Sequence, residues 1–199
     1  MVRLSLPLLL LLLPLTAFAS GSSAQEQWKA FLTRPSATTY EPLSGTIRKC
    51  VVTKCHDAEV SGTEDNFVSL YKLLHLAERG NHYAMEIAFL IRPLYENAAA
   101  PSEDIENSLG LSATVEPKFF LGLTRKYNIP TSQLDRLVLQ TSIESIDSLR
   151  VHREEWKRRI QSFSRVSDPR LSQLRDKAIS LIQHEIDKYS ALPDDAWGK

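Results

Sequence analysis

The stretch TEDNFVSLYKLLHLAERGNHYAMEIAFLIRPLY, residues 63–95, carries the spacing of two successive α-helices. Thr63 can cap the first, whose apolar side chains recur every three or four residues and form one stripe; they are Phe67, Leu70, Tyr71, Leu74 and Ala77. Gly80 follows where a C-terminal cap is expected, and Asn81 can start the next helix at once. That second helix is apolar around most of its circumference until Pro93, which should kink or end it. We therefore expect the second helix to be central and largely buried.

Helical periodicity continues on both sides of this pair, and no segment alternates convincingly like a β-strand. Shorter helices are expected over residues 25–33, 43–55, 101–110 and 114–127, with a polar loop over 36–40. A helix from Thr131 to Phe163, a turn at 164–167 and a helix from Pro169 towards Pro193 predict an antiparallel helical hairpin. The other glycines are typical of turns and caps: Gly45, Gly62, Gly110 and Gly122.

These segments predict an all-α protein, a compact multi-helix bundle that ends in the C-terminal hairpin. The alternative is a short α-solenoid of stacked helix pairs, because the shorter helices recur at a spacing of roughly 20 residues. No repeating sequence signature supports the solenoid. We expect a single helical domain over residues 20–199, in which residues 193–199 form a mobile tail.

The first segment has the features of a secretory signal peptide. Arg3 precedes an apolar run over residues 4–15, and Ala17-Phe18-Ala19 fits the small-x-small cleavage rule. We assign residues 1–19 to the signal and expect cleavage after Ala19, with cleavage after Ala24 as the alternative. The apolar run is short for a helix that spans a bilayer. The sequence therefore predicts a periplasmic or secreted protein with no stable membrane insertion once the signal is removed.

The charges balance over the whole chain, which holds 24 basic and 24 acidic residues. This balance argues against a dedicated nucleic-acid binder. Residues 57–116 hold eleven acids and three bases, whereas residues 117–199 hold fifteen bases and eleven acids. We interpret these regions as solvated faces that attract each other within one domain; a charged partner surface is the alternative. The basic run over 150–159 is interpreted as a solvated helix with i, i+4 ion pairs.

The motif Cys50-Val51-Val52-Thr53-Lys54-Cys55-His56 contains both cysteines of the chain. Two nearby cysteines in an oxidising compartment should form a disulfide. In a continuous α-helix, Cα atoms five residues apart are about 8–9 Å from each other, whereas a disulfide needs less than about 7 Å. A bond between Cys50 and Cys55 therefore requires the helix to break between them, and the β-branched run Val51-Val52-Thr53 favours such a break.

Other interpretations of this motif remain open. Covalent haem attachment normally uses Cys-x-x-Cys-His, and the Cys-x4-Cys-His spacing here resembles a rarer variant found in some multihaem cytochromes. In that case Cys50 and Cys55 would hold the haem, His56 would be the proximal ligand, and Met85 or another histidine the second. A redox-active dithiol usually has two residues between its cysteines and a βαβ context, which this chain lacks. Metal binding and free thiols are further alternatives.

Sequence motifs identify no catalytic residue and no metal site. The chain contains no His-Glu-x-x-His, Gly-x-Ser-x-Gly or phosphate-binding Gly-x4-Gly-Lys pattern. His82 and Glu86 are four residues apart on one helix face, which favours a surface hydrogen bond or ion pair more than a metal ligand.

The functional hypothesis is therefore a non-catalytic periplasmic or secreted protein that binds another protein, as inhibitors, immunity proteins and envelope accessory factors do. Its expected contact surface is the acidic middle of the chain with the tail aromatic residue: Glu96, Glu103, Asp104, Glu106 and Trp197. The alternatives are a haem protein and an envelope-acting hydrolase with a site assembled from dispersed residues. The hydrolase predicts a polar cleft with convergent groups of shifted pKa.

Overall fold

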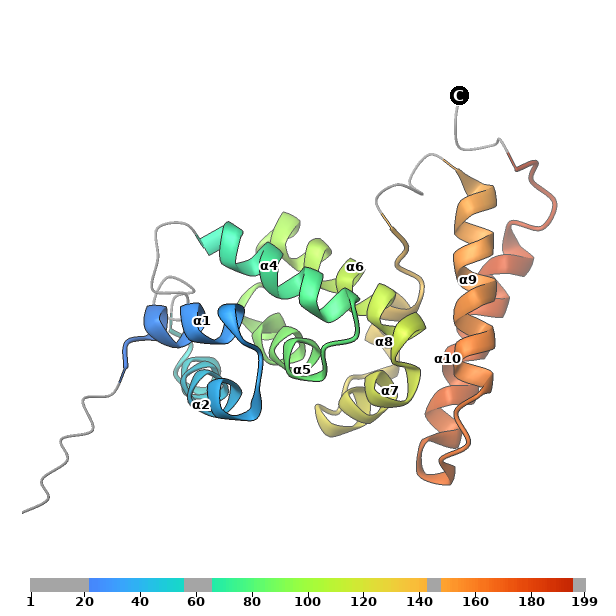
Figure 1. The fold of residues 1–199 in the computed structure, drawn as a ribbon. Coiled ribbons are helices and arrows are strands. Elements are labelled where there is room, and N and C mark those ends of the chain that lie inside the picture. The colour runs from blue at the N-terminus through green and yellow to red at the C-terminus, as the bar shows by residue number, and fades with distance from the viewer. Residues whose placement is uncertain (1–21, 56–65, 143–147, 195–199) are drawn as a thin grey trace, which may run out of the picture.

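A computed structural model of the protein describes residues 22–55, 66–142 and 148–194. All regular secondary structure within these ranges is helical, and the helices pack as a compact bundle (Figure 1). This confirms the predicted all-α bundle and disfavours the solenoid alternative. The expected signal segment 1–19 lies outside the described residues, as does Thr63.

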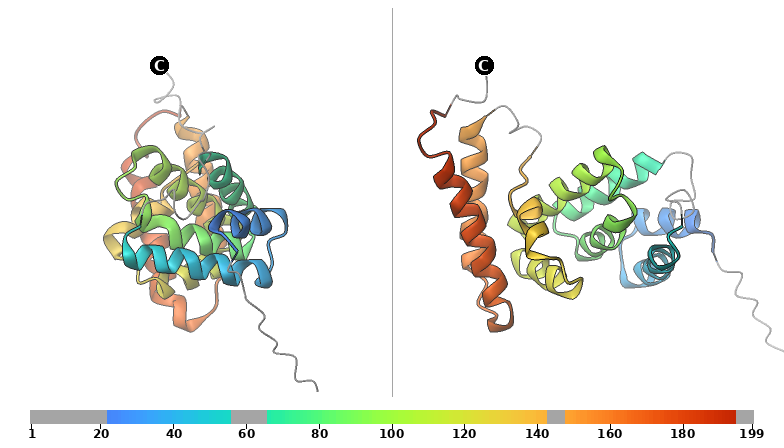
Figure 2. Two further views of the ribbon diagram at one scale, coloured as in Figure 1. Left: turned by 90° about the vertical axis from the view of Figure 1, so that its left-hand side faces the viewer. Right: turned by 180° about the vertical axis from the view of Figure 1, so that it is seen from behind.

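The described helices, in chain order, are α1 (Ala24–Thr33), α2 (Ala37–Thr53), α4 (Asn66–Glu78), α5 (His82–Ile91), η1 (Arg92–Leu94), α6 (Ala99–Val115), α7 (Pro117–Lys126), α8 (Thr131–Val138), α9 (Leu149–Ser164), η3 (Pro169–Leu171) and α10 (Ser172–Lys188). The pair α1–α2 and the pair α9–α10 lie at opposite ends of the molecule (Figures 1 and 2). Helix α6 lies between them and contacts α4, α5, α7, α8 and α9.

The junction of α4 and α5 agrees with the prediction. Gly80 adopts a φ of 81°, a left-handed conformation that glycine adopts without steric cost. The Asn81 side chain accepts a hydrogen bond of 3.0 Å from the backbone N–H of Ala84 and caps α5. Every residue from Ala84 to Ile91 is buried, so α5 is a core helix as expected. It ends at Ile91, and Pro93 lies in the short 3-10 helix that follows.

Three predicted boundaries are wrong. Residues 37–40 of the expected loop are helical, because Ser36 caps α2 and its N–H donates to the Thr39 hydroxyl at 3.1 Å. The helix that was expected to end at Gly110 continues to Val115, and the next one begins only at Pro117. Gly45, Gly110 and Gly122 therefore all lie inside helices rather than in turns.

The expected continuous helix from Thr131 to Phe163 is also wrong. Helix α8 ends at Val138, and α9 begins only at Leu149. Side chains of α9 hydrogen-bond the backbone just after α8: the Trp156 indole donates to Leu139 O at 2.9 Å, and Arg159 Nη1 donates to Gln140 O at 2.6 Å. In a continuing helix, these carbonyls would accept hydrogen bonds from backbone N–H groups of the same helix. Here they accept hydrogen bonds from side chains of α9 instead. The predicted hairpin exists, but consists of α9, η3 and α10.

The cysteines form the predicted pair. Helix α2 ends at Thr53, and Lys54 adopts a left-handed φ of 52°. This break brings the Cα atoms of Cys50 and Cys55 to 5.0 Å, within the range that a disulfide requires, and their sulfur atoms are bonded to each other. The Cys55 N–H donates to Cys50 O at 3.1 Å, which closes the turn.

We expect the double substitution Cys50→Ser with Cys55→Ser to lower the free energy of unfolding by about 2 kcal/mol, the value for a loop this short. Urea denaturation of the oxidised protein against the variant would measure it. The variant should also be insensitive to a reducing agent, whereas the wild type should lose the same amount of stability on reduction. Equal stability of all three forms would contradict the prediction.

Candidate ligand groove on helix α7

The acidic residues expected to meet a partner lie in different environments. Glu96 and Glu103 are exposed, and Asp104 accepts a hydrogen bond of 3.1 Å from the Tyr71 hydroxyl. Glu106 is buried, and its two carboxylate oxygens lie 3.5 Å from Arg92 Nη2 and 3.2 Å from Arg136 Nη2. Glu106 therefore joins α6 to its neighbours and is not part of an exposed surface. Trp197 lies outside the described residues.

The residues proposed for haem attachment are not brought together as a haem site would need. Cys50 and Cys55 are bonded to each other, so neither sulfur has a thiol with which to form a thioether. Met85, considered as an axial ligand, is fully buried in the hydrophobic core. His56 lies outside the described residues. These positions support the disulfide interpretation over the haem alternative.

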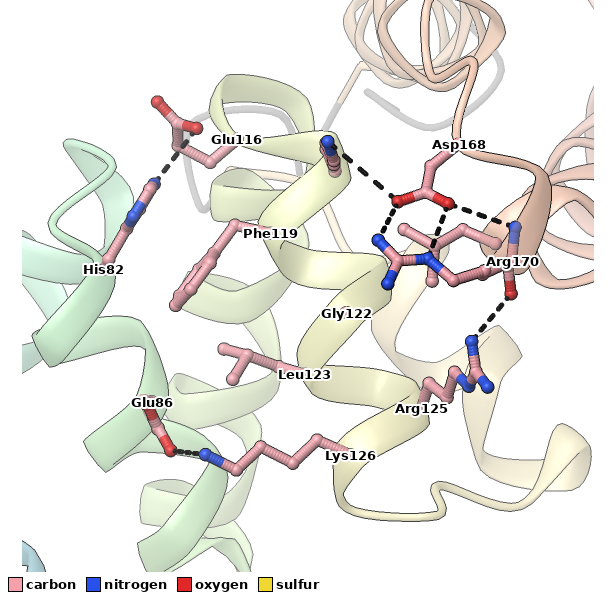
Figure 3. Close-up of a pocket in the computed structure, with 12 residues that line it drawn as sticks. His82, Glu86, Glu116, Phe119, Gly122, Leu123, Arg125, Lys126, Asp168 and Arg170 are labelled. Carbon is pink, nitrogen blue, oxygen red and sulfur yellow. Dashed lines mark hydrogen bonds and ion pairs between the residues drawn. The ribbon is translucent and has the colours of Figure 1, made fainter.

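A hollow lies along α7, between α5 on one side and η3 on the other (Figure 3). We call it the α7 groove. Its volume is about 550 Å³, and it is open to solvent. It is lined by His82, Glu86, Glu116, Lys118, Phe119, Gly122, Leu123, Arg125, Lys126, Asp168, Arg170 and Leu171. These residues come from three segments that are far apart in the sequence, so no local motif could reveal the groove.

The floor of the groove is apolar and contains a glycine. Phe119, Leu123 and Leu171 supply the apolar surface. Gly122 lies between them in the middle of α7, and a Cβ atom built there would have no atom within 4 Å. Glycine inside a helix costs about 0.5–1 kcal/mol relative to alanine. Here that cost is not offset by any close packing of the backbone, and its effect is to leave the floor open.

One wall of the groove is formed by an aromatic pair. The imidazole of His82 stacks on the Phe119 ring, with centroids 3.9 Å apart and ring planes 9° from parallel. His82 Nε2 lies 3.2 Å from a carboxylate oxygen of Glu116. The sequence suggested that His82 pairs with Glu86 on the same helix face. Instead, His82 pairs with Glu116 and stacks on Phe119, and Glu86 contacts residues of other helices.

Glu86 lies on the α5 side of the groove. Its Oε1 forms an ion pair with Lys126, accepts a hydrogen bond of 2.8 Å from the Tyr127 hydroxyl and lies 3.6 Å from Arg48 Nη2. Burial alone would raise the pKa of Glu86, but hydrogen bonds from Lys126, Tyr127 and Tyr40 outweigh burial and hold that pKa below its ordinary value. Burial, and then the hydrogen bond to Glu86, raise the pKa of Tyr127. Glu86 is therefore a stable anion and Tyr127 a neutral phenol at physiological pH.

Asp168 organises the opposite wall. Its carboxylate accepts hydrogen bonds from the Arg170 backbone N–H at 3.1 Å, from Arg170 Nε at 3.1 Å and from Arg170 Nη2 at 2.8 Å. Lys118 Nζ lies 3.9 Å away. The bonds from Arg170, first from its side chain and then from its backbone, lower the pKa of Asp168 to about 2. The outer ends of Lys118 and Arg170 stay open to solvent.

This lowered pKa makes Asp168 a contributor to acid stability. Its stabilising effect should be complete above the ordinary value of 3.8 and should be lost as the pH falls towards 2. We expect Asp168→Asn to lose less stability than the wild type across this interval, as measured by urea denaturation. Asp176→Asn, which removes an exposed carboxylate on α10, is the control. Identical acid sensitivity of the wild type and Asp168→Asn would contradict the prediction.

A second hollow of about 490 Å³ adjoins the groove. We call it the α10 hollow. It shares Arg125 and Arg170 with the α7 groove and extends to Lys177 on α10. Arg125 Nη1 donates to Arg170 O at 3.1 Å and so forms a bridge between the two spaces (Figure 3).

The basic run over 150–159 is only partly the solvated helix that the sequence indicated. Arg158 is exposed and pairs with Glu154 at 3.7 Å, in the expected i, i+4 arrangement. Arg159 is fully buried. Arg153 hydrogen-bonds Tyr189 O and Leu192 O at the end of α10 and forms an ion pair with Asp194, the first acid of the predicted tail. Two of these bases therefore connect helices.

Comparisons with protein-family models, with curated proteins and with solved structures found no match. No helix within the described ranges is long and apolar enough to cross a membrane. Among the same residues, no group of three or more His, Cys, Asp or Glu side chains is placed to hold a metal ion.

Proposed function

We propose that this chain is a non-catalytic binding protein that acts outside the cytoplasm, and that the α7 groove receives a segment of another protein. The observation that carries this proposal is Gly122. A mid-helix glycine with free space above it weakens α7 and keeps an apolar floor accessible. A concave site with an apolar floor and a few polar groups around it is the usual form of a ligand site.

The chemistry of the groove favours binding over hydrolysis. A general acid needs a pKa near the working pH, whereas the carboxyl groups of Glu86 and Asp168 both have a lowered pKa. Each is also neutralised by cations: Glu86 by Lys126, and Asp168 by Arg170 and Lys118. These carboxylates support the walls of the groove and are poor proton donors, so the hydrolase alternative has less support.

Two features support a location outside the cytoplasm. The disulfide between Cys50 and Cys55 is of the kind that persists in oxidising compartments. The sequence of residues 1–19 has the charged, apolar and small-residue regions of a secretory signal.

The proposal can be tested with a photo-reactive amino acid placed at Lys118, on the rim of the groove, in the cells that make the protein. We expect illumination to give a discrete covalent adduct with one protein. The same amino acid at Lys49, which is exposed on α2, should give no such adduct. The adduct from Lys118 should disappear when Gly122→Leu fills the floor. Equal adducts from both positions, or none from either, would reject the groove as a binding site.

A further inference from the structure

The charges around the groove carry an inference about its occupant. Resting on the proposed function, we infer that the occupant is an acidic peptide segment of a partner protein, which places one bulky apolar side chain on the floor beside Gly122.

The charges that face solvent along the two hollows are mainly positive. Five cations and three carboxylates line them. Two of those carboxylates are nearly hidden: Glu86 and Asp168 have side-chain exposures of 11% and 9%. In contrast, the exposures of Lys126, Lys118 and Arg170 are 50%, 71% and 75%. An approaching ligand therefore meets the cations first, which favours an anionic partner.

Two of the cations have no carboxylate partner within the described part of the chain. Arg125 Nη1 donates to a backbone carbonyl, that of Arg170, and no ion pair between described residues involves Lys177. Arg125 lines both the α7 groove and the α10 hollow, whereas Lys177 lines the α10 hollow. The Asp168 carboxylate is shared between Lys118 and Arg170, so it cannot saturate both. Four cations between Lys118 and Lys177, including Arg170 and Arg125, therefore share the single carboxylate of Asp168.

The size and shape of the site fit a peptide. Helix α7 has 10 residues and is therefore about 15 Å long, a length that an extended peptide covers with about four or five residues. The apolar floor at Phe119, Leu123 and Leu171 suits an aromatic or branched aliphatic side chain. A peptide can place carboxylates beside the cations and one branched aliphatic or aromatic side chain on this floor, whereas a polynucleotide carries a phosphate at every residue and has no aliphatic side chain to place there. We therefore favour a peptide over a nucleic acid.

The test begins with random peptides displayed on phage and selected on the immobilised full chain. We expect the enriched peptides to combine Asp or Glu with one Trp, Phe or Leu, and to bind more weakly as salt is raised. A selected peptide, synthesised with a fluorophore, is then measured by fluorescence anisotropy against four variants. Enrichment of neutral or basic peptides, or no enrichment at all, would overturn the inference.

The variants form two matched pairs. Lys118→Glu should weaken peptide binding at least about tenfold. Lys49→Glu makes the same change at an exposed position on α2 and should leave the affinity unchanged. Gly122→Leu should abolish binding, whereas Gly45→Leu should not, because Gly45 also has open space around its Cβ position but lies on α2. Circular dichroism would show that each variant is folded. Equal affinities within either pair would overturn the inference.

The results separate this inference from the proposed function. An adduct from the photo-reactive residue at Lys118 to a partner segment without acidic residues would keep the groove as a binding site but overturn the acidic occupant. Concentration-dependent dimerisation that Lys118→Glu abolishes would instead identify a second copy of this chain as the occupant, and would also overturn the inference. Competition between the selected peptide and the natural adduct would support both proposals together.

Discussion

Replacing Arg159 by methionine should lower the free energy of unfolding by about 3 kcal/mol, because buried hydrogen-bond acceptors left without a donor cost about 1–3 kcal/mol each. Arg159 is fully buried. Its Nη1 donates to Val138 O and Gln140 O at 2.5 and 2.6 Å, and its Nε donates to Thr114 Oγ1 at 3.0 Å. One guanidinium therefore connects α9 to the end of α8 and to α6.

The arginine remains charged in this site. Burial lowers its pKa to about 10, with a partial offset from the negative charge of Glu155, so the guanidinium is still a cation at neutral pH. Methionine keeps an unbranched chain but supplies no donor. Lysine keeps the charge but not the planar fork, so Arg159→Lys should lie between the wild type and Arg159→Met.

Urea denaturation would measure these differences, with Arg158→Met as the control. Arg158 is the adjacent residue, but it is exposed and forms an i, i+4 ion pair with Glu154, so its replacement should change stability by no more than about 0.5 kcal/mol. If Arg159→Met were as stable as the wild type, the cost of burying the guanidinium would equal everything its hydrogen bonds contribute.

Gly110→Ala is the second large effect that we expect, a loss of about 2 kcal/mol. A Cβ at this position would lie 2.8 Å from Leu137 O and 3.0 Å from both Cβ and O of Gln140. Two of these three atoms belong to the backbone, so α6 and the end of α8 would have to move apart. Overpacking of this kind typically costs about 1–3 kcal/mol, which outweighs the helix propensity that alanine adds.

Gly45→Ala and Gly122→Ala are the controls, for which we expect the free energy of unfolding to change in the opposite direction. Neither position has an atom within 4 Å of the added Cβ, and both lie inside helices. Each should therefore raise the free energy of unfolding by about 0.5–1 kcal/mol. Urea denaturation of the three alanine variants would separate the roles of the three glycines. A stabilising effect of Gly110→Ala would contradict the close approach of α6 and α8.

The parts of the fold that the sequence predicted are those with strong local signals. Gly80 and Asn81 marked the turn between α4 and α5, and the disulfide spacing correctly required α2 to break after Cys50. The break between α8 and α9 had no such signal, because it depends on Trp156 and Arg159, which bind the chain from another helix. The helical spacing of apolar residues continues across residues 139–148, so it predicted one continuous helix there.

The candidate groove could not be predicted for a similar reason. His82, Phe119 and Asp168 lie on three separate segments, and only packing brings them to one space. Gly110 and Gly122 look alike in the sequence, yet one permits a close backbone contact and the other keeps a surface open. Distinguishing the two glycines would have required knowledge of which helices lie next to each of them.

The walls of the α7 groove have a consequence for cooperativity. One wall belongs to the turn of the α9–α10 hairpin, through Asp168, Arg170 and Leu171, and the other belongs to α5 in the core. The groove thus exists only while the hairpin is docked, and detachment of the hairpin and occupancy of the groove exclude each other. A bound segment at 100 times its dissociation constant would oppose detachment by about 2.7 kcal/mol. Amide hydrogen exchange in α9 and α10 would then report occupancy of a site whose floor lies on another helix.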